Sequence, residues 1–377
     1  MELLFSRQFH KVFQLLFYYI KNPSSHLPKG TDLTSFPSAN LFYQYALKNK
    51  MIPFIGHLAN CQYCQKKIHP KINKKIKLTF KTFLALSLLQ EQEKEKLGKI
   101  LTKKKISVVL LKNFDKLKNF YPDSFCLQSD IDLFVNSKYK KKLDQLLIDQ
   151  GYQKKQKKKD KDFEYGQKET HYSKISKLGV SFTAEVHYDI LVSPKFHPSR
   201  EAIVGFSNQA LERAKKQAND FLDFSAEDKL LYLILHFYLN DFLQGLRNLY
   251  DIARFVELKK KSLNFNKLYK IAKRYQSYSI VIFVLGLVKR FFLPKLTIDK
   301  SLNQFNFKLA YFFYNPLFTS LVFTNKVYRF EEHRYQLKNF QVINSLVNEK
   351  VSFKTLWRIF RYVLPILVSR TVQNNFD

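Results

Sequence analysis

Alternating apolar and polar residues in the middle of the chain predict three short β-strands. The run ISVVLL at 106–111 is apolar apart from Ser107, and FCLQSDIDLFV at 125–135 ends in IDLFV, where apolar residues enclose Asp132. The segment VSFTAEVHYDI at 180–190 alternates almost perfectly between apolar and polar residues. Successive side chains of a strand point to opposite faces, so this last segment has one buried face and one polar face.

Helical periodicity surrounds these strands. Residues 71–104 predict one long helix, and residues 137–151 predict a short amphipathic helix with Gly151 at the position of a C-terminal cap. From about residue 196 onward the pattern is helical, and Ser225 to Asp228 has the residue types of a capping box. These elements predict helices, then a small mixed unit, then helices again.

This order of elements predicts an α+β fold, in which a small mixed β-sheet core is flanked by helical N- and C-terminal regions. We divide the 377 residues into an N-terminal helical region at 1–72, a core at 73–195 and a C-terminal helical region at 196–377. A chain of this length can bury a substantial hydrophobic core.

The composition is that of a folded but strongly basic protein. Hydrophobic residues make up 46% of the chain, and the formal net charge is +33. Such a charge suits a polyanionic partner, either nucleic acid or the anionic surface of a membrane. A second explanation stays open, because the excess of lysine over arginine and the scarcity of glycine are also typical of A/T-rich codon usage.

Cysteine content and hydropathy suggest the cellular setting. Three cysteines in 377 residues give no disulfide framework, which favours a reducing, cytoplasmic environment. Arg7, His10 and Lys11 interrupt the apolar N-terminus, so it lacks the apolar stretch of a signal peptide. The longest apolar run, at 280–288, is too short to span a bilayer. We therefore expect a cytoplasmic protein with no transmembrane segment.

The two aspartates at 130 and 132 carry the first hint of chemistry. Residues two apart on a strand share a face and lie about 7 Å apart. Together with Glu185 on the polar face of another strand, they form a set of three carboxylates, which suits two Mg²⁺ or Mn²⁺ ions in phosphoryl transfer. The other reading is a strand end that meets solvent. Clustered carboxylates without metal are also expected to raise the pKa of at least one of them.

The order of motifs over residues of about 85–257 resembles the uncharacterised nucleotidyltransferases of the DNA polymerase beta-like superfamily. That pattern has a strand ending in lysine, a Tyr-Pro turn, an Asp-hydrophobic-Asp strand, a helix ending in Gly-Tyr, and later strand and helix motifs. The corresponding residues here are Lys112, Tyr121, Pro122, Asp130, Asp132, Gly151, Tyr152, Glu185, His187, His236, Arg247 and Asp251.

This resemblance implies transfer of a nucleoside monophosphate from an NTP to an unidentified hydroxyl acceptor, for which RNA is one candidate. It implies that Asp130, Asp132 and Glu185 are the catalytic residues and hold Mg²⁺ or Mn²⁺. We expect four further residues to contact substrate: Lys112, Ser129, His171 and His187.

Two departures from the family pattern favour an alternative. Asn113 stands where the family has a glycine, and Cys126 stands where it has an arginine that could bind phosphate in a bidentate way. The alternative is a noncatalytic, basic nucleic-acid-binding protein on a degenerate nucleotidyltransferase scaffold.

Two other groups of residues suggest weaker hypotheses. Cys61 and Cys64 have the spacing of zinc ligands, but the chain has no second cysteine pair to complete such a site. His236 lies in an apolar helix, where a core histidine bonded to a residue such as Asp251 competes with a substrate contact.

Overall fold

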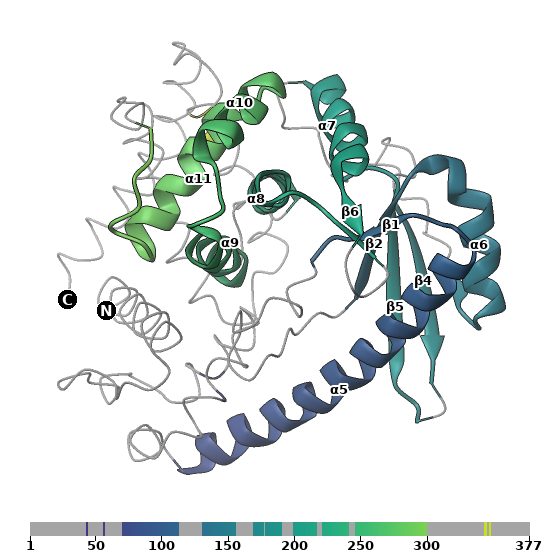
Figure 1. Ribbon diagram of the computed structural model, residues 1–377. Coiled ribbons are helices and arrows are strands. Elements are labelled where there is room, and N and C mark those ends of the chain that lie inside the picture. Colours follow the sequence, from purple (N-terminus) through teal and green to yellow (C-terminus); the bar gives the residue numbers. More distant parts are fainter. Residues whose placement is uncertain are drawn as a thin grey trace, which may run out of the picture.

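The computed structural model has an α+β fold, as predicted. It describes residues 43, 56, 70–112, 130–155, 169–176, 178–190, 199–216, 221–240, 246–299, 343, 344 and 347. Within these residues a seven-stranded mixed sheet lies between helices (Figure 1). The proposed division at residues 72 and 195 stays a prediction.

The sheet combines parallel and antiparallel pairs. Its strands are β1 Val108–Leu110, β2 Ile131–Val135, β3 Gln153–Lys154, β4 Glu169–Ile175, β5 Ser181–His187, β6 Lys215–Lys216 and β7 Leu222–Asp223. Their order is β3-β4-β5-β2-β1-β7-β6. β2 pairs with β5 in parallel and with β1 antiparallel, and β4 pairs with β5 antiparallel. The strands that bear the predicted acidic residues, β2 and β5, are therefore neighbours at the centre.

Helices cover both faces of this sheet. They are α5 Pro70–Lys103, α6 Lys140–Asp149, α7 Arg200–Arg213, α8 Ala226–Leu235, α9 Leu246–Lys259, α10 Phe265–Arg274 and α11 Tyr278–Phe291. In Figure 1, α8 to α11 gather on one side of the sheet and α6 lies on the other. None of the helices in the described ranges is both long and apolar enough to cross a membrane.

Strand alternation divides the apolar side chains between two cores. Ile131, Leu133 and Val135 pack with Ala184 and Val186 in the core that α5 and α6 cover. On the opposite face, Val109, Leu111 and Phe134 pack in the second core, together with residues of the helices α7 to α11. Asp132 precedes Phe134 by two residues and therefore lies on the face turned toward α8.

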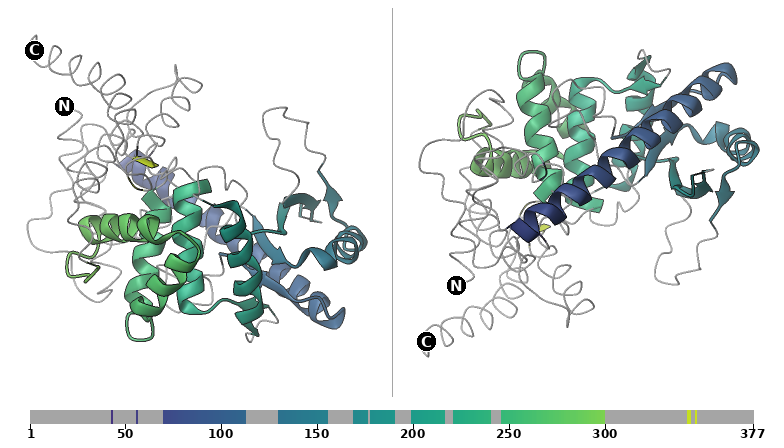
Figure 2. Two further views of the ribbon diagram at one scale, coloured as in Figure 1. Left: turned by 90° about the horizontal axis from the view of Figure 1, so that it is seen from above. Right: turned by 90° about the horizontal axis from the view of Figure 1, so that it is seen from below.

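The helix α5 belongs to both cores. Its first half places Ile76 and Phe80 in the core of the C-terminal helices, and its second half places Leu97 and Leu101 in the core under the sheet. Figure 2 shows this helix running across both parts of the molecule. One long helix therefore fixes the sheet and the helical region relative to each other.

The predicted start of α8 is confirmed. Ser225 is the N-cap and its hydroxyl accepts a hydrogen bond from the backbone N–H of Asp228 at 3.2 Å. The buried carboxylate of Asp228 also receives two hydrogen bonds from Arg213, at 2.9 and 2.7 Å. These contacts fix α8, which continues from Leu235 into a short π-helix, His236–Asn240. Such π-helical turns often occur at functional sites.

Gly151 ends α6 in a left-handed conformation, with φ of +83°, as its predicted role as a C-terminal cap requires. The N–H of Tyr152 bonds to the carbonyl of Leu147 at 3.0 Å, and that of Gly151 bonds to Ile148 at 2.9 Å. This pair of bonds is a Schellman motif, and Tyr152 and Leu147 both pack in the core under the sheet. The glycine is needed for its backbone angle, since no atom lies within 4 Å of an added Cβ.

We therefore expect Gly151→Ala to lower the free energy of unfolding by about 1 kcal/mol, because an L-residue is strained at this φ. Urea denaturation followed by circular dichroism measures the change. Gly205→Ala is the matched control: Gly205 lies within α7, and an added Cβ would meet Tyr275 at an ordinary 3.7 Å. That variant should be neutral or slightly stabilised. Equal losses in both variants would contradict the role of the left-handed angle.

The structure corrects the sequence analysis in one segment. The short strands β6 and β7 lie in a region predicted to be wholly helical, and β7 extends the sheet by pairing with β1. Two residues are too few for alternation to appear, so the hydrophobic pattern could not reveal either strand. The strand β4 was not predicted either, although its sequence ETHYSKI alternates.

Candidate active site

Strand register places Asp132 and Glu185 directly beside each other. In the parallel pair β2–β5, Asp132 is the partner of Glu185, and Phe134 is the partner of His187. All of these side chains point to the face turned toward α8, because the residues between them lie in the opposite core. The fold therefore brings together two carboxylates that are 53 residues apart in sequence.

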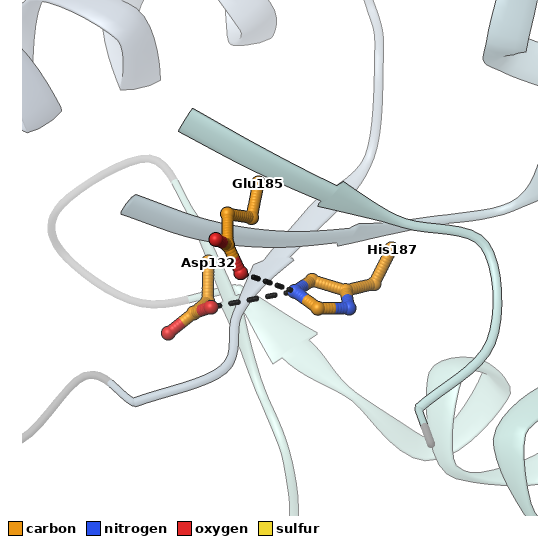
Figure 3. A group of neighbouring side chains, drawn as sticks. All are labelled: Asp132, Glu185 and His187. Atoms are coloured by element: carbon orange, nitrogen blue, oxygen red, sulfur yellow. Dashed lines mark hydrogen bonds and ion pairs between the residues drawn. The ribbon is translucent and has the colours of Figure 1, made fainter. Parts of the chain in front are cut away.

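His187 joins these two carboxylates in one compact group (Figure 3). Its Nε2 lies 3.3 Å from Oδ1 of Asp132 and 3.9 Å from Oε2 of Glu185. Each residue has one potential ligand atom within 4.8 Å of those of the other two. Asp132 is only 2% exposed and His187 6%, whereas Glu185 is partly accessible. The three side chains could together hold a metal ion.

Strand β4 adds a third acid and a second imidazole. His171 is the register partner of Glu185, and Glu169 is that of His187. The ring of His171 bridges two carboxylates, with Nε2 at 2.9 Å from Glu169 and Nδ1 at 3.1 Å from Glu185. Three acids and two imidazoles thus lie next to one another on three neighbouring strands.

Lys112 supplies a cation at the other side of Asp132. The N–H of Leu111 bonds to the carbonyl of Asp132 at 3.0 Å, which continues the β1–β2 pairing up to Lys112. The Nζ of Lys112 then lies 3.1 Å from Oδ2 of Asp132. This lysine was predicted to meet a triphosphate, and its side chain is partly exposed beside the carboxylate.

The pKa of Asp132 is held well below its usual range. Burial alone would raise this pKa, but the charge of Lys112, the hydrogen bond and charge of His187 and the charge of His236 outweigh it. The expectation that clustering would raise a carboxyl pKa is therefore reversed for Asp132. The physical reason is that Lys112 and two imidazoles act on this carboxylate strongly enough to offset its burial.

His171 carries a positive charge at neutral pH. Hydrogen bonds to Glu169 and then to Glu185 raise its pKa to about 9, and burial opposes this only in part. A protonated His171 therefore neutralises part of the negative charge of the acidic residues on β4 and β5.

The buried carboxylate of Asp132 has the properties expected of a metal ligand. Within the described residues its Oδ2 is buried and receives no hydrogen bond, although it forms the ion pair with Lys112. A buried carboxylate oxygen without hydrogen bonds is costly unless a cation contacts it, a role that Lys112 fills here and that a metal ion could fill in its place. Oxygen donors of this kind are what Mg²⁺ and Mn²⁺ prefer, so the residues present fit a divalent ion.

Other predicted site residues lie less centrally or outside the described ranges. Asp130 immediately precedes β2 and is partly buried, but it is not in the group formed by Asp132, Glu185 and His187. Its role as a metal ligand stays a prediction. Several residues of the sequence analysis fall outside the described part of the chain: Asn113, Tyr121, Pro122, Cys126, Ser129, Cys61 and Cys64.

Glu169 was not recognised from sequence, and His236 was named there without a position beside Asp132. Glu169 could have been found, because Glu169, His171 and Ser173 alternate with Thr170 and Tyr172 along β4. His236 could not have been placed near Asp132, because α8 approaches the sheet only in three dimensions. The ring of His236 packs edge-on against Tyr232 at 5.7 Å, and its charge acts on Asp132. Arg247 and Asp251, which belong to the family motif, form an ion pair on α9 at 3.7 Å.

Comparison with known families agrees with this geometry. Residues 38–293 match the sequence profile of the family described as "Uncharacterised nucleotidyltransferase". The chain belongs to this family. The match includes the whole sheet and the helices α5 to α11, so the predicted family is confirmed. No curated protein and no solved structure matches the chain.

For a member of the uncharacterised nucleotidyltransferase family, the buried cluster on β2 and β5 is the natural candidate for the active site. Membership indicates a nucleotidyltransferase with an NTP as substrate. The cluster of Asp132, Glu185 and His187 provides a candidate site for the divalent metal that such chemistry requires.

Proposed function

We propose that the protein transfers a nucleoside monophosphate from an NTP to a hydroxyl acceptor in a reaction that depends on Mg²⁺ or Mn²⁺. The observation that carries this proposal is the direct pairing of Asp132 with Glu185 on adjacent parallel strands, at a buried position, in a chain of the nucleotidyltransferase family. A merely structural role for the buried Asp132 would raise the cost of folding without any return in packing.

Each residue of the cluster has a role in this proposal. Asp132 and Glu185, with Asp130 at the start of β2, would hold the divalent ions. When bound, these ions would neutralise the triphosphate and the charge that develops during transfer. Lys112 would contact the phosphates, since its ammonium already lies beside the metal-binding carboxylate. His187 and His171 line the same face, where a substrate would enter.

The reaction moves one phosphoryl centre between two oxygens. The acceptor hydroxyl oxygen forms a bond to the α-phosphorus, and the bond from that phosphorus to the oxygen bridging to the β-phosphate breaks. Pyrophosphate leaves with the electron pair. The hydroxyl proton passes to Glu185, whose side chain is partly accessible, in contrast to the buried Asp132.

A second candidate function rests on the net charge of +33. In that reading the protein binds nucleic acid without catalysis, and the departures at Asn113 and Cys126 mark a degenerate site. The two carboxylates argue against a noncatalytic binder, because the negative charges of Asp132 and Glu185 would not favour the binding of phosphate.

The proposed activity can be tested with α-³²P-labelled NTPs. Wild-type protein is incubated with each of the four NTPs, Mg²⁺ or Mn²⁺, and pooled RNA, protein and metabolite acceptors. We expect label to appear in one acceptor class, with release of unlabelled pyrophosphate and no transfer in the presence of EDTA. No transfer under any condition, together with tight RNA binding that weakens steeply with salt, would instead support the noncatalytic binder.

A further inference from the structure

The imidazole of His187 is presented to the carboxylates as a ligand would be. Ligand atoms around one octahedral ion with bonds of about 2.1 Å lie roughly 3 Å apart when adjacent and roughly 4.2 Å apart when opposite. The Nε2 of His187 lies 3.3 Å from Oδ1 of Asp132 and 3.9 Å from Oε2 of Glu185. Figure 3 shows this nitrogen turned toward both carboxylates.

The other nitrogen of the same ring faces Glu169, a carboxylate outside the candidate metal-binding group. The Nδ1 of His187 lies 3.9 Å from Oε2 of Glu169, and it is buried without a hydrogen-bond partner among the described residues. A carboxylate behind a ligating imidazole is the usual outer partner of a metal-bound histidine, since it fixes which nitrogen carries the proton.

His171 has the same side chain but a different environment. Both of its ring nitrogens are already engaged, with Glu169 at 2.9 Å and Glu185 at 3.1 Å. Carboxylates hold both of its nitrogens at hydrogen-bonding distance, whereas in His187 only Nε2 is held, at 3.3 Å from Asp132, so His171 serves as a matched control for His187.

Building on the proposed function, we propose that His187 is a direct nitrogen ligand of the divalent ion, with Glu169 as its outer carboxylate. The site then combines two carboxylates and one imidazole. Mg²⁺ prefers all-oxygen coordination, whereas first-row transition metals accept imidazole readily. The protein accordingly binds a transition-metal ion, with Mn²⁺ as the experimental probe, in preference to Mg²⁺.

Pulsed electron paramagnetic resonance of bound Mn²⁺ tests this ligand directly, without an activity assay. A nitrogen coordinated to Mn²⁺ modulates the electron spin echo. We expect ¹⁴N modulation in the wild-type complex, its loss in His187→Gln and its retention in His171→Gln. Glu169→Gln should keep the modulation while weakening Mn²⁺ binding roughly 10- to 100-fold. In His187→Gln the preference for Mn²⁺ over Mg²⁺ should fall, because glutamine offers oxygen.

The outcomes separate this proposal from the proposed function. Stoichiometric Mn²⁺ binding without ¹⁴N modulation, or modulation that survives His187→Gln, would overturn histidine ligation and leave an all-carboxylate site intact. Failure of the wild-type protein to bind Mn²⁺ at all would overturn both. Should His187→Gln not fold, wild-type and His171→Gln proteins made with ¹⁵N-histidine replace it. Both must then exchange the ¹⁴N pattern for a ¹⁵N one, and persistence of the ¹⁴N pattern would refute the assignment.

Discussion

Asp132→Asn is expected to lower the rate of nucleotidyl transfer by roughly 10²- to 10³-fold while the fold persists. The amide has nearly the same shape as the carboxylate but lacks the charge that holds a cation at the centre of the site. Asp132 is the residue that contacts both Lys112 and His187, so its charge acts on every other group of the cluster. Single-turnover transfer of an α-labelled nucleotide measures the loss.

The matched control is Asp149→Asn. Asp149 is exposed at the end of α6, where it accepts a hydrogen bond from Gln145 at 2.8 Å. Because α6 covers the opposite face of the sheet, this variant should transfer label at the wild-type rate. Thermal unfolding and RNA affinity should be nearly the same in both variants. If Asp132→Asn transferred label at an undiminished rate, Asp132 would not be part of the catalytic machinery.

The sequence was sufficient to predict those helices and strands that are long enough to show a hydrophobic period. The alternation in β5 predicted which residues are buried, and Phe182, Ala184 and Val186 do lie in the core under the sheet. The pairing of Asp132 with Glu185 depended on one further condition, that β2 and β5 are neighbours in register. Alternation predicts the face of each side chain, but it contains no information about which strands pair.

The parts of the site that sequence could not supply arise from contacts between distant elements. The alternation of β4 could have placed Glu169 on a polar face, but only the pairing of β4 with β5 places it opposite His187. The low pKa of Asp132 was not predictable either, since it depends on the approach of Lys112 and His236 from two other elements. Counting carboxylates suggested repulsion, whereas the fold places Lys112 and two imidazoles around the central carboxylate.

This arrangement gives Lys112 two successive partners. In the absence of metal, its ammonium partly neutralises Asp132, at 3.1 Å from Oδ2. A divalent ion at the same carboxylate would compete with the ammonium for this oxygen, because two cations at one carboxylate repel each other. The displaced lysine would then be available to the phosphates of an incoming NTP. The metal ion would thus displace the ammonium of Lys112 from Asp132, and the nucleotide would then bind it.

Lys112→Gln is therefore expected to change two affinities in opposite directions. Removing the competing ammonium should tighten binding of Mn²⁺ several-fold in the absence of nucleotide. The same change should lower kcat/KM for the NTP by roughly 10- to 100-fold, because a phosphate contact that amounts to about 1.5–3 kcal/mol is lost. Calorimetric titration of Mn²⁺ and steady-state transfer kinetics measure the two effects separately.

Lys99→Gln provides the control for a general loss of positive charge. Lys99 is exposed on the second half of α5, which packs against the opposite face of the sheet, and its removal should alter neither affinity. If Lys112 had a purely structural role, Lys112→Gln would destabilise the protein and weaken the binding of both ligands together. Opposite signs for metal and nucleotide arise only if one ammonium competes with the metal ion and then binds the triphosphate. Weaker Mn²⁺ binding in Lys112→Gln would therefore reject this exchange.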